Sequence, residues 1–311
     1  MRRYQQTKQA LGSAAYLTLV VPTNRQPDDL FADLWRYIDE FEQRFSRFLA
    51  ISELSACNKA AGSKHMVSPE FRQLLVIARD MSERTGGLYN PFVLPALQRA
   101  GYKGSWPYPD EISASLDFAG RQSASWRDIQ IGKDWIMIPK NTALDFGGIG
   151  KGYLLDELAA RLRARAVDSY WLSLGGDIVC AGLDDPGIPW EISIQDAVHE
   201  NNRVAYVSNQ GNDLAVATSG VTKRKGTSAH GAWHHLIDPR TGEPALSDVL
   251  TATVCAESAT EADVYAKCLV IVGSTETDTF MESVTIRNVL LQQTGSGTTS
   301  IVQKKGLVWQ V

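Results

Sequence analysis

Cysteine is scarce in this sequence, and long hydrophobic runs are missing from it. There are four cysteines among 311 residues, and they form neither a C-x-x-C pair nor a dense framework: Cys57, Cys180, Cys255 and Cys268. This excludes a small disulfide-stapled scaffold and predicts buried free thiols in a reducing compartment. No run approaches the roughly 18 apolar residues of a membrane-spanning helix, so no membrane span is expected.

The N-terminus lacks the features of a targeting segment. Its basic residues are followed by an apolar stretch, 14–21, that alternates and contains Thr18. It has no signal-peptide core or cleavage site, and no lipid-accepting Cys follows. The sequence as written predicts a cytoplasmic protein. If an N-terminal segment preceded it, export would be expected instead.

Positive charge is not concentrated anywhere. The longest basic tract is Lys223-Arg224-Lys225, the net charge is −4 and the isoelectric point is near 5.8. A nucleic-acid partner is therefore not expected. With 44% hydrophobic and 21% charged residues, the composition is that of an ordinary globular protein with ample core.

Helical and strand patterns alternate irregularly along the chain. Alternation predicts a strand over 15–21, and helical spacing predicts helices over 28–45 and from Ser68-Pro69 to Gly86. Further helices are expected over 152–166 and, from the capping box at Ser258, over 258–272. The sequence also predicts a hairpin at 129–138 and short strands at 170–174, 190–194, 203–208, 213–218 and 249–256. Because no regular βαβ rhythm exists, the expected fold class is α+β, with an irregular connection over about 103–126.

A glycine-rich segment, Asp145-Phe-Gly-Gly-Ile-Gly-Lys151-Gly152, directly precedes an expected helix. Its glycines permit close approach to a ligand, the helix start offers N–H groups to an anion, and Lys151 adds a charge. The spacing fits neither a Walker loop nor the Rossmann fingerprint. By itself the segment is compatible with a phosphate site or with a plain strand-to-helix turn.

Histidines cluster in the segment 230–235, where His230, His234 and His235 fall within six residues, close to Asp238. A histidine there suits a general base, a phosphate contact or a zinc ligand. No helical H-E-x-x-H motif or Cys partner supports zinc. Purely structural histidines are the alternative.

An acid and a base, Asp263 and Lys267, lie one turn apart on the last expected helix. From spacing alone the simplest interpretation is a surface ion pair, which contributes about 0.3–0.5 kcal/mol.

Seven short motifs occur in a fixed order along the chain. They are Ser52-Glu-Leu-Ser55-x-x-Asn58, Thr85-Gly-Gly-Leu-Tyr-Asn-Pro91, Asp145-Phe-Gly-Gly-Ile-Gly-Lys-Gly-Tyr153, Leu174-Gly-Gly-Asp177, Ala217-Thr-Ser-Gly220, His235-Leu-Ile-Asp-Pro239 and Ser258-Ala-Thr-Glu-Ala-Asp263. Together they resemble the ApbE family of flavin transferases from about Gly12 to the C-terminus.

The resemblance implies a single ApbE-like α+β domain over 1–311, with a tunnelling-fold-like core and an FAD site between subdomains. It implies transfer of FMN from FAD to a Ser or Thr hydroxyl of an acceptor protein, with release of AMP and with magnesium at the pyrophosphate. The alternatives are an FAD diphosphatase that gives FMN and AMP, and a non-enzymatic flavin-binding protein.

The resemblance also implies roles for individual residues. His235 and Asp263 are the expected catalytic residues. The expected FAD contacts are Leu11, Phe48, Leu88, Tyr89, Asn90, Asp145, Lys151, Ser219, Gly220, His235 and Leu236. The expected metal-site positions are Gly148, Thr260, Asp263 and Lys267.

Three positions depart from the family pattern. Phe48 replaces a Tyr often found near the flavin ring, and Asn90 replaces a usual Asp. Lys267 stands where the family usually has a Thr or Ser metal ligand, and a charged lysine has no lone pair to offer a metal. We therefore expect magnesium to bind weakly here or to be replaced by Lys267, which would point inward and pair with Asp263.

Overall fold

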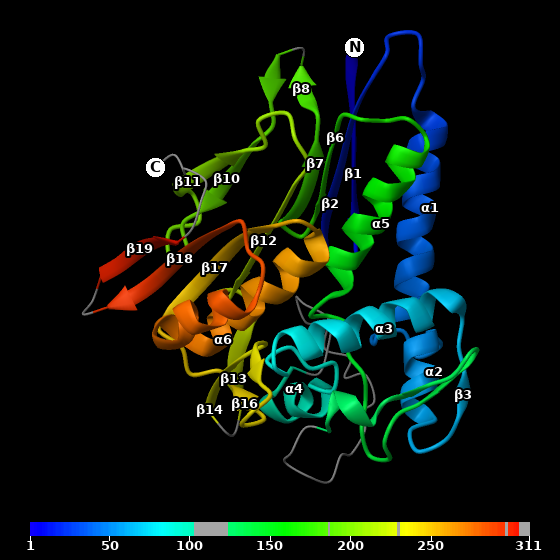
Figure 1. Cartoon of the computed structure of the whole chain (residues 1–311), viewed down its shortest axis with the longest axis vertical. Coiled ribbons are helices and arrows are strands. Elements are labelled where there is room, and N and C mark those ends of the chain that lie inside the picture. The colour runs from blue at the N-terminus through cyan, green and yellow to red at the C-terminus, as the bar shows by residue number, and fades with distance from the viewer. Residues whose placement is uncertain (103–123, 186, 229–230, 296–297, 305–311) are drawn as a thin grey trace.

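An eight-stranded antiparallel sheet forms the centre of the computed structural model, which describes residues 1–102, 124–185, 187–228, 231–295 and 298–304 (Figure 1). Together with the helices packed on it, this sheet confirms the α+β class. From one edge to the other the sheet runs through β1 (Arg2–Ala10), β2 (Ser13–Val21), β6 (Tyr170–Leu174), β7 (Asp177–Ala181), β12 (Leu214–Gly220), β17 (Val249–Ala256), β18 (Asn288–Gly295) and β19 (Thr298–Lys304).

A two-residue turn at Leu11 and Gly12 joins β1 to β2. Both residues have positive φ, 53° and 66°, and Ala10 pairs with Ser13 across the turn, as primed hairpin turns require. A positive φ is unusual for a leucine, and the backbone N–H of Leu11 donates to Glu42 on the neighbouring helix. The sequence pattern predicted β2 but missed β1, because β1 is a polar edge strand with little buried surface.

Three long helices cover one face of the sheet: α1 (Asp28–Phe45), α5 (Gly150–Ala164) and α6 (Ala259–Ser283) (Figure 1). The expected cap of α6 is confirmed, since the Ser258 hydroxyl accepts from the N–H of Glu261. The expected end near residue 272 is confirmed, because the φ of 69° at Gly273 interrupts the helical conformation there. A second helical stretch follows this break and extends α6 to Ser283.

A hairpin of β10 (Glu191–Gln195) and β11 (Arg203–Ser208) covers the opposite face of the sheet. Its apolar residues form a second core with alternate residues of the sheet strands. On β12, for example, Val216 packs toward this hairpin, whereas Ala215 and Ala217 belong to the core under the helices. This is the period-two alternation of a sheet buried on both faces.

The remaining helices and most of the short strands lie beside the main sheet, in the lower half of Figure 1. The helices are α2 (Glu53–Lys59), α3 (Pro69–Arg84), α4 (Leu94–Ala100) and the short 3-10 helix η1 (Trp126–Asp128). The short strands of the molecule are β3 (His65–Met66), β4 (Gln130–Ile131), β5 (Trp135–Met137), β8 (Leu183–Asp185), β9 (Ile188–Pro189), β13 (Lys225–Ser228), β14 (Gly231–His234), β15 (Ile237–Asp238) and β16 (Glu243–Pro244).

Several local expectations are confirmed in this part of the fold. The Ser68 hydroxyl caps α3, and Pro69 occupies its first turn. The hairpin predicted around 129–138 corresponds to β4 and β5. Most of the expected irregular connection, 103–123, lies outside the described residues.

Two further expectations concern the whole chain. The four cysteines are buried and free. Within the described ranges, no helix combines the length and the apolarity needed to cross a membrane.

The crossing of α5 and α6 yields a stability prediction for Gly152→Ala. A Cβ at Gly152 would lie 2.4 Å from the carbonyl oxygen of Ala259, so the helices must separate. We expect the free energy of unfolding, from urea denaturation, to fall by about 1–3 kcal/mol. Gly150→Ala is the matched control, because a Cβ there meets Phe41 at an ordinary 3.4 Å. Equal stability of the two variants would contradict the close crossing.

Candidate functional site

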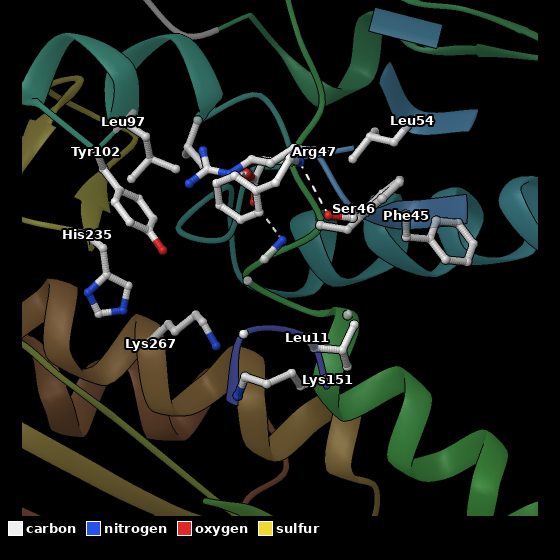
Figure 2. Close-up of a pocket in the computed structure, with 18 of the residues that line it drawn as sticks. Leu11, Phe45, Ser46, Arg47, Leu54, Leu97, Tyr102, Lys151, His235 and Lys267 are labelled. Atoms are coloured by element: carbon white, nitrogen blue, oxygen red, sulfur yellow. Dashed lines mark hydrogen bonds and ion pairs between the residues drawn. The ribbon is translucent and has the colours of Figure 1, made fainter. Parts of the chain in front are cut away.

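A cavity of about 520 Å³ opens among the β1–β2 turn, the end of α1, the start of α5 and the middle of α6 (Figure 2). It brings together most of the residues assigned from the sequence: Leu11, Phe48, Leu88, Tyr89, Asn90, Asp145, Gly148, Lys151, His235, Leu236 and Lys267. Ser219, Gly220, Thr260 and Asp263 are not among its lining residues. Ser219 and Gly220 lie on β12, paired with Ala252 and Thr251 of β17.

The glycine-rich loop before α5 is a tightly bonded turn. Its Asp145 carboxylate accepts the N–H of Gly147 at 2.6 Å and pairs with the Nε of Arg47 at 3.1 Å. The helix begins at Gly150, two residues earlier than expected, and the N–H of Gly152 donates to Asp263. This N–H group is therefore used inside the protein. Side-chain cations are better placed than the start of α5 to hold an anion here.

Cations gather at one end of the cavity. Lys151 and Lys267 lie across the cavity from Arg47, with His235 beside them (Figure 2). Lys151 forms an ion pair with Asp177. Burial lowers the pKa of Lys151 to about 8. Asp263 opposes this shift, whereas Lys267 and Arg224 reinforce it.

The pKa of His235 lies well below that of an ordinary histidine. Burial first, and then the charges of Arg224 and Lys267, lower its pKa to about 3. Its imidazole is thus neutral throughout the physiological range. Its ring also lies edge-on to Tyr102, with 6.4 Å between ring centroids.

His234, the neighbouring histidine, has a structural role. Its Nε2 contacts the carbonyl oxygen of Ala245 at 2.9 Å, and its Nδ1 accepts the N–H of Leu236 at 3.3 Å. The third histidine, His230, lies outside the described residues. In the described part of the chain, no group of three or more His, Cys, Asp or Glu residues is arranged to hold a metal, so the zinc hypothesis gains no support.

Asp263 and Lys267 form a buried ion pair, so the surface ion pair favoured by spacing alone is wrong. The Asp263 side chain is 1% exposed and that of Lys267 14%. Burial alone would raise the pKa of Asp263, but Lys267 and Lys151 hold it below its usual range. The expected pairing is thus observed inside the protein, where Lys267 lines the cavity and Asp263 lies behind it.

Thr260 uses its hydroxyl elsewhere. The hydroxyl donates to Asp156 on α5 at 2.6 Å, and the same carboxylate accepts the N–H groups of Ala259 and Thr260. These three bonds hold the first turn of α6 against α5. Asp156 therefore caps the start of α6, the Thr260 hydroxyl is used as a donor to it, and the geometry gives no support to metal binding by Thr260.

Arg47 dominates the opposite end of the cavity, and sequence reasoning missed it. Its guanidinium lies over the rings of Phe48 and Tyr102, 4.7 Å from each centroid, while its Nε pairs with Asp145. Arg224 and Tyr102, which also line the cavity, were missed as well. Nothing local marks Arg47 or Arg224 among 31 lysines and arginines, because their roles arise from contacts distant in sequence.

Asn90 and Tyr89 are both nearly buried in the wall. The Asn90 side chain accepts the N–H of Phe92 and donates to the carbonyl of Ala124, so it stabilises a turn. Tyr89 is 6% exposed, and its ring lies against Gly148. These contacts explain how the segment after α3 is held at the cavity, without a charge at position 90.

We expect Arg47→Met to lower the free energy of unfolding by about 3–5 kcal/mol, because it leaves the buried Asp145 carboxylate without its cation. Combining Arg47→Met with Asp145→Asn should recover much of the lost free energy of unfolding. A double-mutant cycle from urea denaturation measures this recovery. Arg36→Met is the control, since Arg36 is 67% exposed. A loss no larger than that of the control would show that the Arg47–Asp145 pair contributes little.

Known proteins match this chain over nearly its whole length. The family model described as "ApbE family" covers residues 11–290. The FAD:protein FMN transferase of Treponema pallidum is 31% identical over 239 residues, and the alignment covers 71% of this chain and 65% of that protein. The protein of the same name from Vibrio cholerae is 26% identical over 277 residues, covering 86% and 80%.

Solved structures agree with this match. Apo flavinyl transferase ApbE from Pseudomonas stutzeri superposes with a TM-score of 0.84 at 21% identity, covering 98% of this chain and 95% of that one. Flavin transferase ApbE from Vibrio cholerae gives 0.79 at 23% identity, covering 97% of both chains. The shared fold and the extent of the family match lead to one conclusion: this chain belongs to the ApbE family.

Proposed function

We propose that the protein binds FAD in this cavity and transfers its FMN half to a Ser or Thr hydroxyl of an acceptor protein, releasing AMP. The observation that carries the proposal is the division of the cavity into an aromatic end and a cationic end. FAD has matching parts, a flat ring system and an anionic pyrophosphate. The relatives' name, FAD:protein FMN transferase, describes the same reaction.

The cationic end suits the chemistry of phosphoryl transfer. The acceptor oxygen forms a bond to the FMN-side phosphorus while the bond from that phosphorus to the bridging oxygen breaks, and AMP leaves with this oxygen. Negative charge on the phosphoryl oxygens is stabilised by fixed cations in a water-poor site. Lys151, Lys267 and Arg224 are the cations placed for this role.

His235 is the proposed acceptor of the hydroxyl proton. It is neutral at physiological pH, so its imidazole has a lone pair available. A bound pyrophosphate opposes the charges of Arg224 and Lys267, which removes part of the cause of the low pKa and makes His235 a stronger base. FAD binding and the basicity of His235 are thereby coupled.

The chain acts as one ApbE-like unit in this reaction, because the helices on the main sheet and the elements beside the sheet both contribute to the cavity wall. FAD is the substrate, and the acceptor is a protein segment that presents a hydroxyl at the cavity mouth. Magnesium has no step in this proposal, because the residues that would hold it here are otherwise engaged.

The purified protein, incubated with FAD, should release AMP detectable by chromatography. With a flavin-accepting protein present, covalent flavin should appear as a fluorescent band on a denaturing gel. His235→Ala should slow AMP release by about 10²–10⁴-fold, the range for a general base. His199→Ala, on the exposed surface, is the matched control. AMP release without acceptor labelling would indicate a diphosphatase, and FAD binding without AMP a flavin-binding protein.

Lys151 should make FAD affinity depend on pH. The anion binds the protonated amine, so affinity is highest below the free-state pKa of about 8 and falls as pH rises through it. The groups facing Lys151 are Asp177, Asp263, Lys267 and Arg224.

The FAD affinity should fall by at most about tenfold per pH unit, which is the limit for one linked proton. Lys151→Arg stays charged and should flatten the profile, as measured by quenching of flavin fluorescence. An unchanged slope in Lys151→Arg would assign the dependence to another group.

A further inference from the structure

The side chains that would have to hold a divalent ion in this chain, those of Thr260, Asp263 and Lys267, already have partners within the protein. On Asp263, Oδ1 contacts the ammonium of Lys267, and Oδ2 accepts the N–H of Gly152 at 3.3 Å. The ammonium also contacts the backbone carbonyl of Asp263 at 3.2 Å. The Thr260 hydroxyl is bonded to Asp156. The expected donor set therefore does not fit a metal.

The Lys267 side chain lies between Gly148 and Asp263, the two groups expected to hold the ion. A Cβ added at Gly148 would lie 3.7 Å from Cδ of Lys267 and 3.1 Å from the Tyr89 ring. The lysine stem therefore runs beside Gly148, and its head reaches Asp263. An ion bridging Gly148 and Asp263 would have to displace this side chain.

From these contacts we infer that the Lys267 ammonium takes the place of a divalent ion, so that this protein binds FAD without metal. The inference rests on the proposed function. It names Lys267 as a residue that contacts the pyrophosphate directly, while it also neutralises the buried Asp263.

The charges around the site support this inference. Among the described residues around Lys151, three cations, Lys151, Lys267 and Arg224, face two carboxylates, Asp177 and Asp263. Within this described set the cations exceed the acids before any ion is added. A divalent ion would lie close to fixed ammonium groups that repel it, whereas the pyrophosphate is attracted to all three.

Lys267 is also held in the position that this role requires. It lies one helical turn after Asp263, and an acid followed by a lysine at this spacing is the favourable orientation on a helix. Its side chain is only 14% exposed, so solvent screens it little. A lysine fixed in this way presents a charge without the reorganisation that a flexible surface lysine would need.

The experiment measures FAD affinity by flavin fluorescence, once in the presence of a chelator and once in the presence of millimolar magnesium. It compares the wild type, Lys267→Thr and Lys267→Arg. Binding of Mn²⁺ in the presence of FAD is followed separately by electron paramagnetic resonance. Lys133→Thr, which removes an exposed lysine from the β4–β5 turn, is the matched control.

We expect the wild type and Lys133→Thr to bind FAD equally well under both conditions and to leave Mn²⁺ free. Lys267→Thr should lose affinity about tenfold or more in chelator, as removal of a charged partner predicts, and should regain affinity with magnesium while binding Mn²⁺. Lys267→Arg should keep metal-independent binding.

Two results would overturn the inference. One is a wild type that binds FAD only with magnesium. The other is a Lys267→Thr variant that folds, by circular dichroism, and keeps wild-type affinity in chelator. If Lys267→Thr does not fold, the wild-type magnesium titration and Lys267→Arg still decide. A wild type that binds no FAD under either condition overturns the proposed function itself.

Discussion

The crossing of α5 and α6 is the contact on which the cationic end of the cavity depends. Each helix supplies a carboxylate to the start of the other. Asp156 of α5 accepts three hydrogen bonds from the first turn of α6, and Asp263 of α6 accepts the N–H of Gly152 on α5. A glycine at position 152 lets the backbones approach closely enough for this exchange. Lys151 and Lys267 project from the two helices at this crossing, so its geometry sets their separation.

Burial of Asp263 creates a requirement for positive charge that the chain itself meets. An ionised carboxylate in the interior is strongly unfavourable unless it is paired and hydrogen-bonded. Lys267 meets the requirement from one turn away, and Lys151 adds a second positive charge. In the family pattern a metal ion is expected to serve this purpose. Here the same carboxylate is satisfied by a covalently attached cation that no chelator can remove.

Local sequence patterns predicted the parts of the fold that depend on local chemistry. The hydroxyl caps at Ser68 and Ser258 and the helical spacing of α1 were sufficient to place three helices. The strand β1 was missed because its residues are polar, and the pairing that stabilises it is supplied by β2. The end of the first helical part of α6 near residue 272 was also predicted, whereas the second helical stretch after Gly273 was not.

The site was predictable to the extent that motifs mark it. The ordered motifs assigned His235, Asp145 and Lys151 to one site, and in the structure all three line one cavity. The low pKa of His235 and the hydrogen bond from the Thr260 hydroxyl to Asp156 were not predictable, because both depend on burial and on partners more than 10 residues away. Arg47 has the same property, since its partner Asp145 lies on another segment of the chain.

The pairing of Arg47 with Asp145 also determines how a ligand with one anionic part and one flat part would lie. Because this guanidinium is neutralised by a buried carboxylate and lies over two aromatic rings, that end of the cavity has flat groups and little net charge. In the described part of the chain, the other end of the cavity carries three cations that face two carboxylates. Under the proposed function, an anionic pyrophosphate would therefore be drawn to Lys151 and Lys267, and the ring system would be left to stack near Arg47. The two ends thus differ among the described residues: the single cation Arg47 is paired with Asp145 at one end, and three cations face two carboxylates at the other.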